Sequence, residues 1–479
     1  MKNNSSLCWA DVNREAPAWF RDAKFGLFFH LGPYSVPAYE NEWYSRNMYA
    51  KGSSQNLYHI KTYGPLDKFG YKDFYSMFRC EKFDPDEWAE LVVRSGAKYA
   101  GPVTEHADNF SMWNSQVNPV NCVNYGPKRD ITGECVKAFR ERGIKILSTF
   151  HHQWLWGWFM STDNEADVYV PENEKFYGKA LPLETNRYIP YRLPDDEFNT
   201  MWRNKVIEVI DKYSPDVLYF DSRANIIGER YKYEVVDYYY NISNNSEGII
   251  TYKQEDFPDN IGVLDIECGR FSTAKSFPWQ TDNRLEDNIT WCMVQNPKYK
   301  PAVEIVHQLC DVVAKNGNLL LNVGPYADGS FHPEAKQILM EVGNWLNVCG
   351  EAIYATRPYK IAVEGPTDVD DSNYDVNRIN KQLENDGIAS DIKLKTFTAR
   401  DFRFTQKGDA IFAIALGWPQ DRVLRIRTFK RSDENPDVKH IELLGSDAPV
   451  MFRQTDSYLE VELPEKPPCD YAHALKLHV

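Results

Sequence analysis

The stretch DVLYFD, residues 216–221, decides the fold of this chain. Apolar and aromatic residues follow one another there without polar alternation, which indicates a strand buried on both faces of a parallel sheet. The run ends in Asp221, a carboxylate that is costly to bury unless a partner or a function requires it. Runs of the same kind recur at 24–32, 97–106, 143–152, 248–253, 262–267 and 317–325.

Helical patterns separate several of these runs. The segment 83–96 begins with Asp84 as a candidate N-cap and Pro85 at the first helical position, and it ends at Gly96. Apolar residues recur at helical spacing in 196–215, and again in 301–317, where Gly317 is expected to close the helix. Strand and helix in alternation predict a (β/α)8-like barrel of the TIM type. An eighth strand, or a distorted gap in the barrel, is expected near PWQTDNRLEDNITW, residues 278–291.

The character of the chain changes after residue 357. Alternating apolar and polar residues appear in runs that are separated by polar turn segments, namely 394–404, 409–418, 422–429 and 458–464. Such alternation is typical of antiparallel strands with one buried face. We therefore expect a catalytic barrel over 1–357 and a C-terminal antiparallel β-sandwich domain over 358–479.

Composition narrows the class of partner. The chain of 479 residues carries a net charge of −14, which disfavours nucleic acid and anionic membranes and suits a neutral small ligand. No run of about 18 apolar residues occurs, so no membrane span is expected. The N-terminal residues lack the apolar core of a signal peptide, and the 9 cysteines are scattered, so we expect a cytoplasmic protein without disulfides. No cofactor motif is present, and no cofactor is expected.

Polar residues stand where the predicted strands end. In a barrel of this type the carboxyl ends of the strands carry the chemistry. Any one of these residues alone has a structural reading, as a hydrogen-bonded histidine or as the N-cap of the next helix. These residues close six separate strands, however, so we expect them to converge on one rim of the barrel. The residues are His30, Glu105, His106, His151, His152, Asp221, Lys253 and Glu267.

Asp221 and Glu267 form the pair that decides the predicted reaction. Two carboxylates that face a glycosidic bond can divide the work, one attacking the anomeric carbon and the other protonating the leaving oxygen. A separation of roughly 5–5.5 Å implies a retaining route, and a wider one implies inversion. The rival use of histidine with carboxylate is a metal site. Because side chains alternate along a strand, His151 and His152 should point to opposite faces, and no metal site is expected.

The motifs resemble those of the α-L-fucosidases of glycoside hydrolase family 29. Four segments are similar in the same order: WFRDAKFGLFFHLGPYSVPAYENEWY (19–44), SGAKYAGPVTEHADNFSMWNS with GPKRD (95–130), DVLYFD (216–221) and GNLLLNVGPYADGSFHPEA with GNWLNVCGEAIYAT (317–356). The resemblance implies a retaining exo-α-L-fucosidase that releases terminal fucose from glycans. It implies Asp221 as the nucleophile and Glu267 as the acid/base. It also implies that the fucose is held by His30, Glu42, Trp43 and His106.

Some positions depart from the family pattern. Leu31 replaces an aromatic residue, Ser222 follows the nucleophile in place of glycine, and the family's KHHDGF reads EHADNF at 105–110. We expect His151 or His152 to take over from the missing second histidine, and Lys253 to join the substrate site. Glu255 and Glu286 stay open as alternatives for the acid/base. The alternative functions are a retaining exo-glycosidase of another sugar and a catalytically silent fucose-binding barrel.

Overall fold

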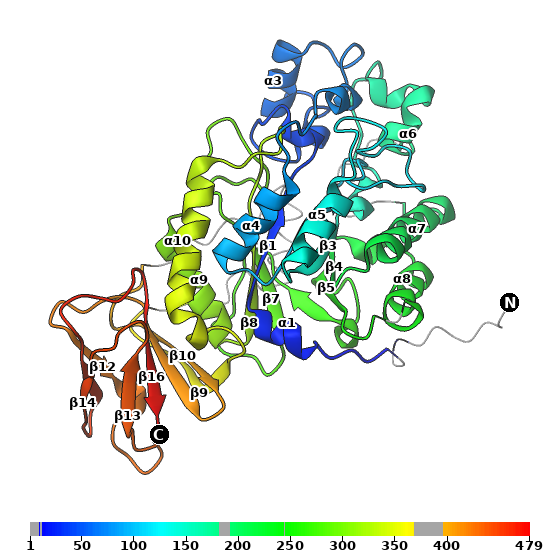
Figure 1. The fold of residues 1–479 in the computed structure, drawn as a ribbon. Coiled ribbons are helices and arrows are strands. Elements are labelled where there is room, and N and C mark those ends of the chain that lie inside the picture. Colours follow the sequence, from blue (N-terminus) through cyan, green and yellow to red (C-terminus); the bar gives the residue numbers. More distant parts are fainter. Residues whose placement is uncertain (1–8, 10–11, 182–191, 244, 368–395) are drawn as a thin grey trace.

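A computed structural model of the chain describes residues 9, 12–181, 192–243, 245–367 and 396–479. Eight parallel strands close into a barrel in the order of the sequence, each paired with its neighbours and β1 with β8. This confirms the predicted barrel (Figure 1). The strands are β1 (Phe25–Phe29), β2 (Tyr99–Glu105), β3 (Lys145–Phe150), β4 (Val217–Phe220), β5 (Ile249–Lys253), β6 (Val263–Asp265), β7 (Trp279–Arg284) and β8 (Gly317–Asn322).

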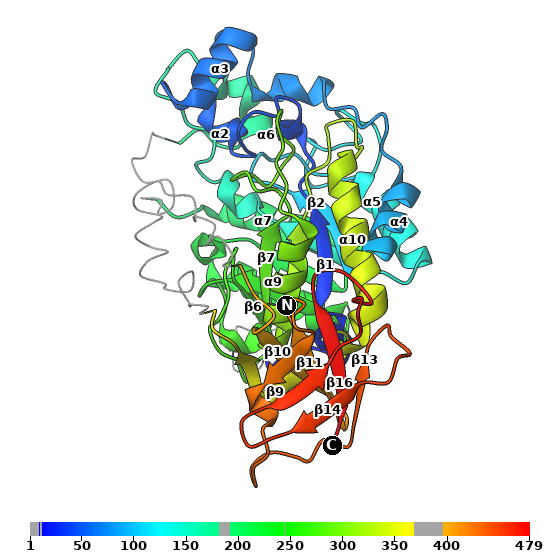
Figure 2. The same cartoon turned by 90° about the vertical axis from the view of Figure 1, so that its left-hand side faces the viewer.

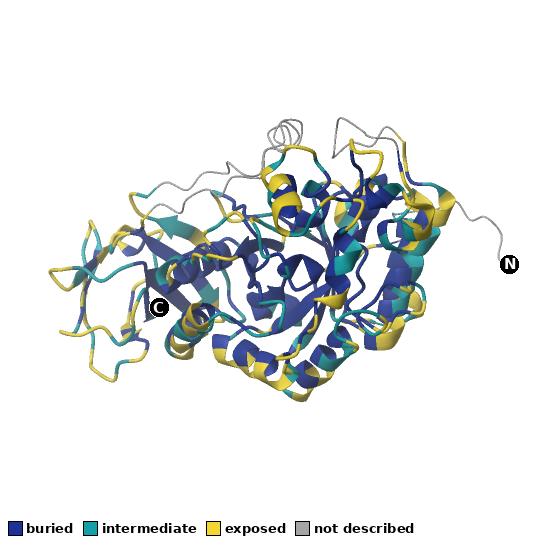
Figure 3. Ribbon diagram, turned by 90° about the horizontal axis from the view of Figure 1, so that it is seen from above, coloured by how far each residue is buried: buried dark blue, intermediate teal, exposed yellow. Residues whose placement is uncertain are grey.

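Helices cover the outside of the barrel, and their exposed faces stand out from the buried strands (Figure 3). Their ends follow local chemistry: α4 begins where Asp84 accepts from the backbone N–H groups of Asp86 and Glu87, and it stops at Gly96 in the left-handed region. The larger helices are α4 (Pro85–Ser95), α5 (Ile131–Glu141), α7 (Asp196–Tyr213), α8 (Glu229–Asp237), α9 (Ala302–Ala314) and α10 (Pro333–Cys349).

Gly317 does not close the helix as expected. The helix α9 ends at Ala314, and Gly317 is the first residue of β8. A Cβ at this position would come within 2.7 Å of the Trp279 ring on the neighbouring strand β7. The glycine is therefore explained by the close packing of two strands rather than by a helix end.

Short helices extend the barrel at the carboxyl end of its strands, the upper end in Figure 1, opposite α1 (Ala18–Ala23). They are α2 (Tyr44–Asn47), α3 (Ser54–Thr62) and α6 (Glu174–Tyr177). Aromatic residues fill the space between them; Tyr63, for example, stacks on Phe69 with ring centroids 5.2 Å apart. The segments that lead into and out of these helices form the wall around the carboxyl rim.

The C-terminal part consists of two antiparallel sheets, in the orders β13-β16-β11-β10-β9 and β12-β15-β14. Both sheets contribute to one apolar core, as the expected sandwich requires. The strands are β9 (Arg357–Glu364), β10 (Phe402–Lys407), β11 (Ala410–Ala415), β12 (Val423–Ile426), β13 (His440–Leu443), β14 (Met451–Gln454), β15 (Leu459–Glu462) and β16 (His473–His478). The first sheet lies beside α9 and α10 (Figure 2). The boundary at residue 357 stays a prediction.

Within the described residues, no helix combines the length and the apolar character needed to cross a membrane.

Candidate active site

The carboxyl rim of the barrel gathers most of the predicted site residues. His106, His151 and Asp221 each stand directly after a strand, β2, β3 and β4 respectively, and Lys253 is the last residue of β5. His30 follows β1 and forms a parallel bridge with Cys292. Glu267 differs slightly from the expectation, because β6 ends at Asp265 and Glu267 lies in the loop that follows. All of these positions are at the same end of a closed barrel.

Three of the histidines form a cluster. The ring centroids of His30 and His106 are 5.7 Å apart, those of His30 and His151 are 5.4 Å apart, and those of His106 and His151 are 4.9 Å apart. The family pattern has a second histidine at the position of Ala107. In this chain the imidazole beside His106 is that of His151. His152 does not join the cluster. Its ring stacks on Trp202 at 5.7 Å, and its Nε2 lies 3.2 Å from the Trp202 carbonyl oxygen.

Burial keeps the clustered imidazoles neutral. It lowers the pKa of His30 to about 4, although the hydrogen bond with Asn322 opposes this shift. Burial also holds the pKa of His106 and of His151 well below the ordinary value, and the neighbouring histidines add to the effect. A neutral imidazole has one donor and one acceptor nitrogen. The cluster can therefore both donate to and accept from the hydroxyl groups of a ligand.

Asp221 is held by a tryptophan. Its Oδ2 accepts a hydrogen bond of 2.8 Å from Trp154 Nε1, and its backbone N–H donates to the Phe150 carbonyl oxygen on β3. Burial raises the pKa of Asp221 to about 6, while the positive charge of Lys253 and the hydrogen bond from Trp154 act in the opposite direction. Asp221 is partly exposed, so a ligand can reach its carboxylate, which is incompletely solvated.

Glu267 shares Lys253 with Asp221. Its Oε2 lies 3.9 Å from Lys253 Nζ, and its side chain is 35% exposed at the rim. Surrounding protein raises the pKa of Glu267 to about 7 by desolvation, Lys253 opposes the rise, and the charges of Asp282 and Asp221 add to it. The surroundings of Glu267 therefore favour its protonated form. The charge of Lys253 thus acts on both carboxyl groups at the rim.

Two buried aspartates hold that ammonium group from below. Lys253 Nζ lies 2.8 Å from Asp265 Oδ1 and 2.5 Å from Asp282 Oδ1, and the Tyr219 hydroxyl donates to Asp282 Oδ2 at 3.1 Å. Burial raises the pKa of Asp265 well above its usual range. Against the same desolvation, Lys253 holds the pKa of Asp282 below its usual range. Sequence reasoning missed both aspartates, although each stands in a run recognised as a strand or a possible strand.

Aromatic residues form one wall of the site. The half-buried Trp43 ring contacts Trp154 at 5.4 Å and Trp158 at 4.8 Å between ring centroids. Beside it, Glu42 Oε2 accepts a hydrogen bond of 2.8 Å from the backbone N–H of Trp291. Trp156 faces away, because its ring packs on Phe198. Trp43 and Trp154 thus present flat apolar surface next to the Asp221 carboxylate.

The EHADNF segment is stabilised by a buried ion pair. Glu105 Oε1 lies 2.5 Å from Lys205 Nζ of α7, and these side chains are 0% and 1% exposed. Lys205 Nζ also donates to Asn109 Oδ1 at 2.9 Å, and Ser111 Oγ donates to Glu105 Oε2 at 2.5 Å. Glu105 and Asn109, which stand where the family pattern has lysine and glycine, therefore belong to a structural network that Lys205 joins. The replacement leaves His106 in the cluster.

The alternative acids lie differently. Glu255 is exposed. Glu286 is buried at 1% exposure, and its Oε1 accepts a hydrogen bond of 2.9 Å from the Gly324 backbone N–H. Burial raises the pKa of Glu286 to about 7, but its carboxyl group serves to hold the loop after β8. Among the ion pairs of the described residues, Glu267 is the one candidate of the three that contacts Lys253.

Comparisons with known proteins agree on one family. The family model for α-L-fucosidase matches residues 2–351, and the model for the α-L-fucosidase C-terminal domain matches residues 395–478. Tissue α-L-fucosidase of Homo sapiens is 27% identical over 98% of this chain and 91% of its own length. The α-L-fucosidase of Dictyostelium discoideum is 29% identical over 74% of this chain and 75% of its own length.

Solved structures agree as well. The crystal structure of Thermotoga maritima α-fucosidase in complex with fucose is similar with a TM-score of 0.75, at 26% identity and over 100% of both chains. A complex of that enzyme with a mechanism-based inhibitor has a TM-score of 0.76 at 27% identity, over 100% of this chain and 99% of that one. Because the first family model covers well over half of the sequence, the chain belongs to the α-L-fucosidase family and is a glycoside hydrolase.

Proposed function

We propose that this protein is a retaining exo-α-L-fucosidase in which Asp221 is the nucleophile and Glu267 is the acid/base. The observation that carries the proposal is that Asp221 and Glu267 stand at the same rim of the barrel, where Glu267 Oε2 lies 3.9 Å from Lys253 Nζ and the charge of Lys253 acts on both carboxyl groups. A nucleophile must be ionised and a general acid protonated at the same pH. Burial raises the pKa of both groups, to about 6 for Asp221 and about 7 for Glu267, so near neutral pH one carboxyl group can be ionised while the other holds its proton.

The reaction follows in two displacements. The Asp221 carboxylate attacks the anomeric carbon, while Glu267 transfers its proton to the glycosidic oxygen and the bond to the leaving group breaks. In the second step the Glu267 carboxylate takes a proton from water, which attacks the same carbon and releases fucose from Asp221. Lys253 stays charged throughout and limits the repulsion between the two carboxylates when both are ionised.

Sugar recognition is assigned to the surrounding residues. His30, His106 and His151 provide donors and acceptors for the ring hydroxyls, and Glu42 accepts from a neighbouring pair of hydroxyls. Trp43 and Trp154 offer apolar surface for the methyl group of a 6-deoxy sugar. His152 supports α7 through Trp202 and is not assigned to the sugar. The substrates are oligosaccharides or glycoconjugates with terminal α-L-fucose.

The test uses paired aryl glycosides. We expect nitrophenol release from an aryl α-L-fucoside and none from an aryl β-D-galactoside, with α-L-fucose as the first anomer that NMR detects. Faster release from another glycoside would favour the alternative of a different sugar. Binding of L-fucose without any hydrolysis would favour a silent barrel, and β-L-fucose as the first product would refute the retaining mechanism.

A further inference from the structure

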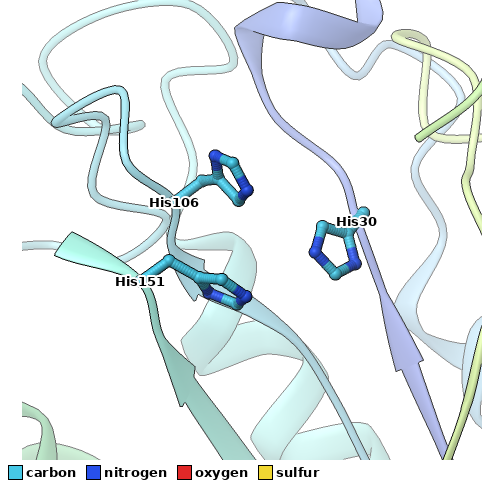
Figure 4. Close-up of side chains that lie close together, drawn as sticks. All are labelled: His30, His106 and His151. Atoms are coloured by element: carbon cyan, nitrogen blue, oxygen red, sulfur yellow. The ribbon is translucent and has the colours of Figure 1, made fainter. Parts of the chain in front are cut away.

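The histidine cluster has the form of a metal site. His30, His106 and His151 stand at the ends of three neighbouring strands, β1, β2 and β3, and Figure 4 shows their rings facing a common space. One possible ligand nitrogen from each ring lies within 4.8 Å of the other two. The three residues are only 2%, 6% and 5% exposed. Among the described residues, this is the one group in which three such ligands come together.

Two nitrogens of the cluster lack protein partners. Neither His106 Nδ1 nor His151 Nδ1, both buried, has a hydrogen-bond partner in the described part of the chain. A buried polar atom without a partner carries a free-energy cost that a ligand would remove. The imidazoles of His106 and His151 thus have hydrogen-bonding capacity that no described protein group uses.

The third ring is oriented by a hydrogen bond. His30 Nδ1 lies 2.7 Å from Asn322 Oδ1, and Asn322 Nδ2 donates to the Trp291 carbonyl oxygen at 2.6 Å. The second contact fixes which end of the amide is oxygen, so His30 Nδ1 must be the protonated nitrogen. The lone pair is then on Nε2. Metal-binding histidines are commonly oriented in this way by an acceptor at the other ring nitrogen.

The ligand set of the cluster suits a divalent cation. Its charged neighbours act in both directions, because Asp282 favours a positive charge at His30 and Lys253 opposes one. Three imidazoles with a free fourth position are a common ligand set for Zn²⁺. A tetrahedral ion needs its ligand nitrogens about 3.3 Å apart, which small ring rotations toward the shared space can provide.

We propose that His30, His106 and His151 bind one Zn²⁺ ion, and that this ion competes with the sugar for the same imidazoles. The metal is an inhibitor in this scheme and takes no part in hydrolysis. The competition rests on the proposed function, because it requires fucose to be held by these three histidines. The binding of Zn²⁺ itself does not depend on the proposed function.

Calorimetry on the full-length, tag-free enzyme after chelator treatment tests the site. We expect one Zn²⁺ per chain, and Co²⁺ in its place should give the intense visible absorption of a four-coordinate ion. In His151→Phe the affinity for Zn²⁺ should fall by about 100-fold or more, since even the loss of a residue that only orients a metal ligand costs about 10–100-fold. The matched control is His152→Phe, next in sequence but facing Trp202, which should bind Zn²⁺ as the unaltered enzyme does.

The outcomes separate the two parts of the proposal. Equal Zn²⁺ affinity in His151→Phe and the unaltered enzyme, or no Zn²⁺ binding at all, would overturn the metal site. Saturating L-fucose should weaken Zn²⁺ binding at least about tenfold, and Zn²⁺ should raise KM for the aryl fucoside without lowering kcat. Zn²⁺ binding that depends on His151 but ignores L-fucose would overturn the competition and, with it, the placement of fucose by the histidines. Circular dichroism and thermal unfolding establish that each variant is folded.

Discussion

Removing the charge of Lys253 should move the pH range of activity upward. Lys253→Met removes the cation that most favours the ionised forms of Asp221 and Glu267, so both groups hold their protons to higher pH. In the proposed mechanism, activity requires Asp221 to be ionised and Glu267 to be protonated. The acidic limb of kcat/KM, which belongs to Asp221, and the alkaline limb, which belongs to Glu267, should therefore both shift to higher pH.

The distance between Lys253 and Glu267 sets the magnitude. At 3.9 Å from Nζ to Oε2, Coulomb's law gives about 1 kcal/mol with the dielectric constant of water and about 4 kcal/mol with an effective value of about 20. The Glu267 side chain is 35% exposed, so solvent screening brings the interaction toward the lower figure. About 1.4 kcal/mol corresponds to one pH unit. We expect the alkaline limb to rise by about one pH unit.

The assay is initial-rate hydrolysis of an aryl α-L-fucoside across the pH range, at substrate concentrations below KM. Lys82→Met is the matched control, because Lys82 is 68% exposed and pairs with Asp328 rather than with Asp221 or Glu267. Its profile should coincide with that of the unaltered enzyme. Thermal unfolding shows whether Lys253→Met is folded despite the loss of the partner of Asp265 and Asp282. An unchanged or lowered alkaline limb in a folded variant would refute the role given to Lys253.

Four further substitutions test neighbouring parts of the site. Asp221→Ala should lower kcat by about a thousandfold or more, and added azide should restore turnover and yield a fucosyl azide that NMR identifies. Glu267→Ala should impair natural oligosaccharides far more than aryl fucosides with good leaving groups; equal losses would assign the acid role to another residue. Trp154→Phe removes the donor to Asp221 and should raise the acidic limb by about one pH unit, while an unmoved limb would contradict that contact. Lys205→Met leaves Glu105 buried without its partner and should cost about 3–5 kcal/mol in urea unfolding. Adding Glu105→Gln should recover part of that loss, and additive effects in the double variant would show that the pair does not interact.

The barrel was predictable because its strands are buried on both faces. Such strands consist of continuous apolar runs, and DVLYFD with its terminal aspartate is the clearest of them. The segment that contains the polar TDNR was predicted to hold either a strand or a distorted gap, and it forms β7. Those polar side chains are buried in the barrel, where Asp282 joins a hydrogen-bonded network that has no periodic signal along the chain.

Contacts across the barrel were beyond the reach of the sequence. The pairing of Lys253 with Asp265 and Asp282 depends on how three strands are staggered, and local pattern does not encode that stagger. His151 and His152 do contact different partners, but both follow β3 and His152 begins a short helix, so the alternation of a strand is not the cause. The Glu105–Lys205 pair joins residues far apart in sequence, so the sequence showed only that the lysine of the family pattern is missing. The structure shows that Glu105, which replaces this lysine, has its own partner in Lys205.

The junction between the barrel and the C-terminal sheets bears on attempts to shorten this enzyme. Asp311 of α9 is 1% exposed, and it pairs with Arg403 Nε of β10 at 2.5 Å and with Lys315 Nζ at 2.8 Å. The α9 helix is buried along nearly its whole length, on the side away from the barrel as well. A truncated chain that ended after the barrel would expose the apolar helix α9 to water. It would also leave the Asp311 carboxylate without the guanidinium group of Arg403. Because the sandwich covers α9, we expect its removal to destabilise the barrel, unlike the removal of an independent binding module.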